Sequence, residues 1–186
     1  MSAAVPNASR AAAVGRAAAY ADSGALQRDL ASLVAYRTES QNPDQRDALY
    51  DYLRTAVAPR LQGLGFSCQV KDNPVDGGPP FLIGERLEDP AQPTVLMYAH
   101  GDVVRGNAAK WEAGRAPWRL QVDGDRWYGR GTADNKGQHT INLTALRQTL
   151  RARGGKLGFN ATWLIETGEE AGSPGLAAFC EAQREA

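Results

Sequence analysis

The sequence has few of the residues that mark several protein classes. Its 186 residues include 2 Cys, 2 His and 2 Met, and its 21 basic side chains balance its 21 acidic ones to a net charge of zero. Because there is no basic excess to neutralise a phosphate backbone, we expect no nucleic-acid partner. No run of about 18 apolar residues occurs, so we also expect no membrane-spanning helix and no membrane partner.

The chain has an ordinary globular composition, with 42% apolar and 23% charged residues, which excludes an intrinsically disordered chain. At this length one domain is the natural expectation. Cys68 and Cys180 stand alone in apolar contexts, without a CxxC pair. We expect both to be free thiols of the core, which is typical of an intracellular protein, and we predict a cytoplasmic location.

The N-terminal segment is rich in alanine. Arginines and a glycine interrupt residues 8–21, so the segment lacks the unbroken apolar stretch of a secretory signal, and it fits a transit peptide only weakly. We predict a loosely docked helical extension over residues 1–22, followed by the main domain over residues 23–186.

Apolar spacing predicts two amphipathic helices at the start of this domain. They cover residues 23–36, with Ser23 as the N-cap, and residues 43–63, which Pro59 kinks or ends. Short apolar runs bounded by Gly and Pro then predict strands, including a hairpin that turns at Asp123-Gly124. The predicted strands and hairpin lie at 66–70, 81–87, 94–99, 118–131 and 160–166.

The runs at 94–99 and 160–166 are continuously apolar, which is typical of strands buried on both faces. One helix is predicted over residues 137–153 and another after Ser173-Pro174, with the serine as its N-cap. Since strands and helices interleave, we predict an α/β sandwich with a mixed, largely parallel sheet.

Ligands of such sheets gather at the carboxyl ends of the strands, and His100 follows the run 94–99 at that end. Asp102 comes two residues later, where its carboxylate would fix the tautomer and ring plane of a metal-binding imidazole. The alternative is a core histidine that is satisfied by a hydrogen bond.

Two further segments carry carboxylates at comparable places. The glycine-rich loop 129–137 has three interpretations: it presents Asp134 as a ligand, it binds a phosphate, or it is an ordinary turn. It lacks the GxxxxGK[ST] pattern of phosphate-binding loops. Glu169 and Glu170 follow the run 160–166, and on an extended segment neighbouring side chains point in opposite directions. One would then bind metal while the other faces water; the alternative is a solvated acidic pair before a helix.

Intervals of 34 and 35 residues separate His100, Asp134 and Glu169, about one strand–helix–strand interval each. An imidazole with several carboxylates is a donor set suited to Zn²⁺, Mn²⁺ or Co²⁺, and it lacks the thiolates of structural zinc sites. Together the three segments favour a metal site over the alternatives for each one.

Three segments also resemble the motifs of a known family. YAHGDVV, WYGRGTADNKGQ and LIETGEEAGSPG are similar to the motifs HxDVV, YGRGxxDxKG and EExGSPG. These motifs, in this order and at similar spacing, are those of the zinc aminoacylase, carboxypeptidase G, acetylornithine deacetylase and succinyl-diaminopimelate desuccinylase family, which the sequence therefore resembles. The resemblance covers residues 25–186 and implies a three-layer, phosphorylase/hydrolase-like fold.

The resemblance also implies a role for each candidate residue. His100 would bind one zinc ion, Asp102 would orient His100, and Asp134 would bridge both zinc ions. Glu169 would be the general base and Glu170 a ligand of the other ion. The peptide bond between Asp134 and Asn135 would be cis. The implied cofactor is a pair of divalent ions, zinc with cobalt or manganese as alternatives.

The implied reaction is hydrolysis of an amide bond in a small peptide or an N-acyl amino acid, by a metallopeptidase or amidohydrolase that is a homodimer at full length. The family needs another Asp and His after the Glu pair, but only Glu181 and Glu185 follow here as acids, and no further His. We also expect the family's lid or dimerisation domain to be missing from these residues. We therefore expect the N-terminal part of a catalytic domain, with two protein ligands per ion.

Three alternatives remain open at this point: an active metallohydrolase domain, a catalytically incompetent fragment or metal-binding remnant, and a nucleotide-binding module that uses the loop 129–137. His139 lies in the helix after this loop and is expected outside the site, because no family motif needs a histidine there.

Overall fold

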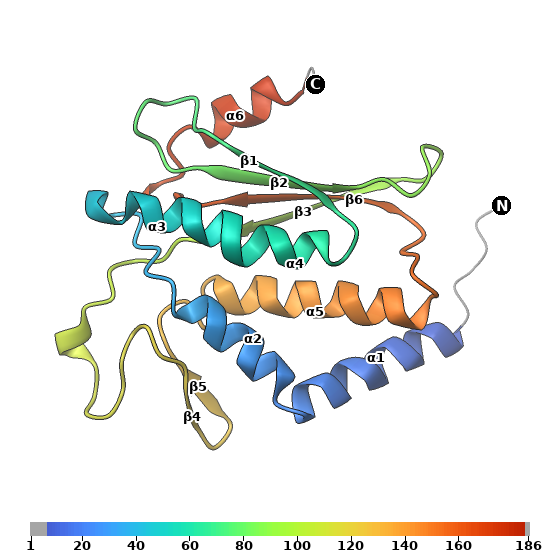
Figure 1. The fold of residues 1–186 in the computed structure, drawn as a ribbon, viewed down its shortest axis with the longest axis horizontal. Coiled ribbons are helices and arrows are strands. Elements are labelled where there is room, and N and C mark those ends of the chain that lie inside the picture. The colour runs from blue at the N-terminus through green and yellow to red at the C-terminus, as the bar shows by residue number, and fades with distance from the viewer. Residues whose placement is uncertain (1–6, 185–186) are drawn as a thin grey trace.

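A computed structural model describes residues 7–184 (Figure 1). The helices are α1 (Asn7–Asp22), α2 (Ala25–Val34), α3 (Arg46–Asp51), α4 (Ala58–Gln62), α5 (Lys136–Ala152) and α6 (Leu176–Ala182). The strands are β1 (Ser67–Lys71), β2 (Phe81–Arg86), β3 (Thr94–His100), β4 (Gln121–Asp123), β5 (Arg126–Tyr128) and β6 (Asn160–Glu166). Single turns are η1 (Pro43–Gln45), η2 (Tyr52–Val57), η3 (Ala108–Lys110) and η4 (Glu169–Ala171). Glu185 lies outside the described residues.

The main sheet has the strand order β1-β2-β6-β3. β3 and β6 pair in parallel and are joined through α5, the crossover that parallel neighbours require. The pairs β1/β2 and β2/β6 are antiparallel. The predicted α/β class and mixed sheet are confirmed, but the share of parallel pairing is smaller than expected. Apolar runs and turns predict where strands lie, whereas pairing direction depends on which strands become neighbours.

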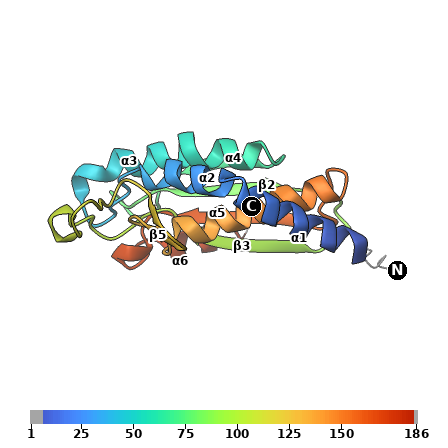
Figure 2. The ribbon, with the colours of Figure 1, turned by 90° about the horizontal axis from the view of Figure 1, so that it is seen from below.

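Helices cover both faces of this sheet, which confirms the expected three layers (Figure 1). On one face η2, α4 and α5 enclose the main core around the fully buried Trp163 of β6. On the other face Phe179 of α6 stacks on Phe81 of β2, with ring centroids 4.2 Å apart. The helix α1 runs along α5 in both views (Figures 1 and 2). The proposed domain boundary after residue 22 stays a prediction.

The interpretation of residues 94–99 as a doubly buried strand is wrong. β3 lies at one edge of the described sheet, with β6 as its strand partner there. The side chains of Val95, Leu96 and Tyr98 are therefore 42%, 67% and 48% exposed. The same interpretation holds for residues 160–166, because β6 is a central strand with helices on both faces, and five of its seven residues are buried. An apolar run does not distinguish a central strand from an edge strand.

The predicted helix over residues 43–63 forms as a series of helical segments. Its predicted apolar face is confirmed, since Tyr52, Leu53 and Val57 are fully buried. The turn η2 is π-helical, and Pro59 follows it in the first turn of α4. A proline at the start of a helical segment loses no intrahelical hydrogen bond, so the chain continues without a break there.

Two predicted N-caps are wrong. The N-cap of α2 is Gly24 rather than Ser23, and the N-cap of α6 is Gly175 rather than Ser173. Both glycines adopt left-handed backbone angles, with φ of 73° and 83°, which a residue without Cβ tolerates best. Ser173 instead donates its hydroxyl to Glu166.

The two cysteines are free, as expected. Cys68 is half-buried, but Cys180 is exposed, so its placement in the core is wrong. Its neighbour Phe179 is the residue of α6 that faces the sheet, and the next position of a helix points about 100° away. Among residues 7–184, no helix combines the length and apolarity needed to cross a membrane.

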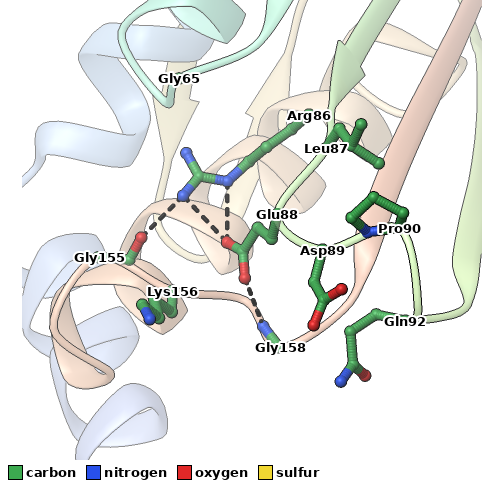
Figure 3. A pocket seen from close by; sticks show the side chains of 10 residues that line it. All are labelled: Gly65, Arg86, Leu87, Glu88, Asp89, Pro90, Gln92, Gly155, Lys156 and Gly158. Carbon is green, nitrogen blue, oxygen red and sulfur yellow. Dashed lines mark hydrogen bonds and ion pairs between the residues drawn. The ribbon is translucent and has the colours of Figure 1, made fainter.

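An ion pair lines a cavity of about 640 Å³ at the end of β2 (Figure 3). Arg86 Nη2 lies 3.0 Å from Glu88 Oε1, and the guanidinium also donates to the carbonyl of Gly155. Glu88 accepts hydrogen bonds from the backbone N–H groups of Leu157 and Gly158, at 2.7 Å and 2.9 Å. These contacts attach β2 to the turn between α5 and β6.

Burial alone would raise the pKa of Glu88, but the N–H groups of Leu157 and Gly158 and the Arg86 charge outweigh it and hold this pKa below its usual range. A carboxyl whose pKa is depressed in the folded state stabilises that state above its unfolded pKa. The contribution is lost as pH falls through the folded value. The Glu88 network should therefore stabilise the fold at neutral pH and fade in acid.

We predict that Glu88→Gln lowers the free energy of unfolding by about 2 kcal/mol at pH 7, because the amide places an N–H against a backbone N–H and removes the ion pair. Urea unfolding measures this, with Glu85→Gln on the exposed face of β2 as the matched control. The difference between wild type and Glu88→Gln should shrink below about pH 4. Equal stability of the two proteins at pH 7 would contradict the prediction.

Candidate metal centre

The candidate residues come together because β3 and β6 run in the same direction. His100 and Glu166 are partners at the last position of this parallel ladder, so the segments that follow both strands begin side by side. Gly101 donates its N–H to the carbonyl of Glu166 and continues the pairing by one residue. The loop before α5 supplies Asp134 to the same end of the sheet, as ligand sites of α/β proteins require.

His100 is nearly buried and has a carboxylate at each ring nitrogen. Its Nε2 lies 2.9 Å from Asp134 Oδ1, and its Nδ1 lies 3.3 Å from Asp102 Oδ1. Glu169 Oε2 is 3.9 Å from Nε2. The three segments predicted to build one site therefore meet at this imidazole.

Asp102 is fully buried and does more than face the imidazole. Its Oδ1 accepts the N–H of Glu169 at 3.3 Å, and its Oδ2 accepts the N–H of Glu170 at 3.1 Å. The carboxylate thus holds the turn η4 in place. The sequence predicts Asp102 only as a partner of His100, since spacing along the chain carries no information on which backbone N–H groups the carboxylate meets.

Residues before η1 also support the site and were missed. Thr38 is buried and donates its hydroxyl to the carbonyl of Gly101 at 2.7 Å. Gln41 Nε2 donates to the carbonyl of Glu170 at 2.7 Å. In the sequence this stretch is a polar turn of ordinary composition, so no motif marks it as part of a site.

The carboxylates around His100 favour the protonated, positively charged form of its imidazole. Burial opposes protonation, but the hydrogen bonds and charges of Asp102 and Asp134 outweigh it and raise the pKa of His100 to about 9. The pKa of Glu170 is raised by burial and then by the neighbouring charge of Asp134. Four carboxylates thus share the surroundings of a single imidazole.

The donor set fits a divalent metal ion. One imidazole nitrogen and one carboxylate oxygen at 2.9 Å are spaced as two ligands of one ion, given metal–ligand bonds of about 2.0–2.2 Å. Within residues 7–184, no group of three or more His, Cys, Asp or Glu side chains is arranged to hold an ion. The described residues therefore bring two donors together rather than the three that a catalytic zinc ion usually has.

The loop before α5 has two further properties that bear on the alternatives. The peptide bond between Asp134 and Asn135 is cis, as the family resemblance implies. Lys136 is fully buried and donates its ammonium to the carbonyls of Leu33 and Tyr36. Because this side chain points into the core, it offers no charge to a phosphate at the loop, which argues against a nucleotide-binding module.

An α/β sheet with an imidazole and several carboxylates at its strand ends is an architecture of metal-dependent hydrolases. The sequence model described as Peptidase family M20/M25/M40 matches residues 96–186, so this part of the chain belongs to that family. The match includes every candidate residue and confirms the resemblance found in the three motifs.

Known relatives agree with this assignment. A cysteinylglycine-S-conjugate dipeptidase of Corynebacterium striatum is 31% identical over 160 residues, which are 85% of this chain and 34% of the relative. A beta-Ala-His dipeptidase of Mus musculus is 36% identical over 145 residues, or 72% of this chain and 28% of the relative. The chain thus spans about a third of the length of the relatives that it matches.

The fold is similar to that of a solved structure, human carnosine dipeptidase 1. The TM-score is 0.83 and the sequence identity 29%, over 93% of this chain and 38% of that one. The arrangement of helices and sheet described above is therefore similar to that of the corresponding part of this solved structure.

The hydrogen bonds of Asp102 lead to a prediction on stability. Asp102→Asn places an N–H₂ group against a buried backbone N–H of η4, so we predict a loss of about 2 kcal/mol in the free energy of unfolding. Asp134 is the control, because its side chain is 69% exposed and Asp134→Asn should change stability by no more than about 0.5 kcal/mol. Urea unfolding in a metal chelator measures both. Equal losses would show that Asp102 does not hold the turn.

Proposed function

We propose that this chain forms part of a metal-dependent peptidase that hydrolyses amide bonds of small peptides. The observation that carries the proposal is the meeting of His100 Nε2 with Asp134 Oδ1 at 2.9 Å and with Glu169 Oε2 at 3.9 Å. The dipeptidase names of the relatives support peptide hydrolysis, and N-acyl amino acids remain the second substrate class.

In this proposal His100, Asp134 and Glu170 hold two divalent ions. Bound zinc, cobalt or manganese ions supply Lewis-acid polarisation of an amide carbonyl and activate water. Asp102 faces Nδ1 of His100 and keeps the imidazole in one orientation, as carboxylates that pair with the second nitrogen of metal-binding histidines do. Its complete burial suits that role, since it has no access to substrate.

Glu169 is the candidate general base. Its side chain is 45% exposed, and its Oε2 lies 3.9 Å from His100 Nε2. Its backbone N–H is fixed by Asp102, so the carboxylate is anchored while its oxygens remain free to meet water. It would accept a proton as water attacks the carbonyl and return that proton to the leaving amine.

A metal-binding remnant without activity is the second candidate. It is favoured by the presence of two donors rather than three at one place among the described residues. We further propose an intracellular, cytoplasmic location, consistent with the free thiols of Cys68 and Cys180, and a homodimer for the longer enzyme, without nucleic-acid or membrane partners.

Metal titration tests the centre itself. We predict that the chain binds Co²⁺ or Zn²⁺ more weakly than zinc sites with three or four ligands do. His100→Ala should weaken binding at least about tenfold, because it removes the imidazole donor, while Glu169→Gln should leave it unchanged. Calorimetry measures both. If His100→Ala binds as tightly as wild type, the ion lies elsewhere.

Hydrolysis of Cys-Gly and β-Ala-His in the presence of Zn²⁺, Co²⁺ or Mn²⁺ separates the two candidates. An active domain should lose about 100-fold or more in kcat on Glu169→Gln, with KM and metal content unchanged. Loss of metal together with activity would make Glu169 a ligand instead. If wild type binds metal but cleaves neither peptide, the remnant is the better description.

A further inference from the structure

Tyr52 and His139 form a buried polar pair directly behind the candidate centre. Both side chains are fully buried, and the Tyr52 hydroxyl lies 2.6 Å from His139 Nε2. Tyr52 opens the π-helical turn η2, and His139 lies in the first turns of α5. Eighty-seven residues separate them in the sequence, so no motif connects them.

The ring of Tyr52 supports the backbone that carries two site residues. A Cβ placed on Gly101 would lie 2.6 Å from the ring, so the ring packs directly against this glycine. Gly101 is the residue between His100 and Asp102, and Thr38 holds its carbonyl. The position of the Tyr52 ring therefore limits where the segment 100–102 lies.

His139 links the same ring to the other ligand segment. It follows Asp134 by five residues, and its backbone N–H bonds to the carbonyl of Asn135 at 3.2 Å. Burial first, with the charges of Lys136 and His100, lowers the pKa of His139 to about 3, so the ring is neutral and shares one hydrogen bond with the Tyr52 hydroxyl through its Nε2. The Tyr52–His139 bond thus ties the segment of His100 to the segment of Asp134.

Packing alone does not account for a histidine at this position. Its Nδ1 is buried and has no partner of good hydrogen-bond geometry among the described residues, although the backbone of His100 lies near enough to act on the pKa of the ring. An apolar side chain of similar size would avoid the cost of burying this nitrogen. The cation of Lys136 lies 4.9 Å from the centre of the Tyr52 ring and adds a second contact from α5. The contacts of Tyr52 with Gly101, His139 and Lys136 therefore join the segment after β3 to α5.

We propose that the Tyr52–His139 pair is a positioning pair, which holds His100 and Asp134 at the separation that a metal ion needs. Neither residue touches the ion or the substrate. The inference rests on the proposed metal centre and assigns to His139 a role that the sequence motifs do not.

Co²⁺ titration with optical detection of the bound ion tests the pair in the intact chain. Tyr52→Phe keeps the ring and removes the hydrogen bond, so we expect about tenfold weaker Co²⁺ binding and a changed visible spectrum. Tyr36→Phe is the matched control. Its ring packs edge-on against Tyr52 at 5.4 Å, but its hydroxyl bonds to Thr55 at 3.0 Å, away from the site. It should leave both affinity and spectrum unchanged.

A second pair of variants tests the other partner. His139→Gln retains an acceptor for the Tyr52 hydroxyl and should bind Co²⁺ more tightly than His139→Leu, which retains none. All titrations are made well below the melting temperature of each variant, so that loss of fold does not enter.

The outcomes separate this inference from the proposed function. If wild type binds no Co²⁺, the metal centre itself is refuted and the positioning pair with it. If wild type binds Co²⁺ but Tyr52→Phe binds equally well with the same spectrum, only the positioning pair is refuted. An equal loss in Tyr52→Phe and Tyr36→Phe would also refute it, since any lost hydroxyl in this region would then have the same effect.

Discussion

The buried carboxylate of Asp102 is the interaction on which the candidate centre depends. It faces the imidazole of His100 and accepts the backbone N–H groups of Glu169 and Glu170. A charge taken out of water is tolerated only when polar groups replace its hydration. For Asp102 these polar groups are the His100 imidazole and the backbone N–H groups of Glu169 and Glu170. Because one carboxylate binds all three, it also fixes the imidazole and the Glu pair relative to each other.

This arrangement divides the site into a fixed part and an accessible part. Asp102 and His100 are buried, whereas the side chains of Asp134 and Glu169 are 69% and 45% exposed. In the proposed function, the buried residues would orient the site, and the exposed carboxylates would meet the metal ions and water. Glu169 belongs to both parts, because its backbone is bound by Asp102 while its carboxylate is open to solvent, which is the combination that a general base requires.

From the sequence it could be predicted where most strands and helices lie and which residues gather at the strand ends, but not which residues each of them contacts. Apolar runs located β3 and β6, but only the pairing shows that β3 is an edge strand with Leu96 67% exposed. Spacing and motifs led to His100 and the carboxylates as candidates, because ligand sites of such sheets lie at strand ends. The contacts of Thr38 with Gly101 and of His139 with Tyr52 could not be predicted, since these partners lie 63 and 87 residues away and such contacts leave no local pattern.

The central strand β6 is held in the same way at both ends. Before the strand, Glu88 from the end of β2 accepts the N–H groups of Leu157 and Gly158. After it, Asp102 from the end of β3 accepts those of η4. Because β2 is antiparallel and β3 parallel to β6, their ends meet opposite ends of this strand. The carboxylates of Glu88 and Asp102 therefore fix the position of β6 along its axis. A shift in the register of β6 would break both sets of hydrogen bonds. The distance from His100 to the Glu pair thus depends on the pairing of β6 with both neighbouring strands.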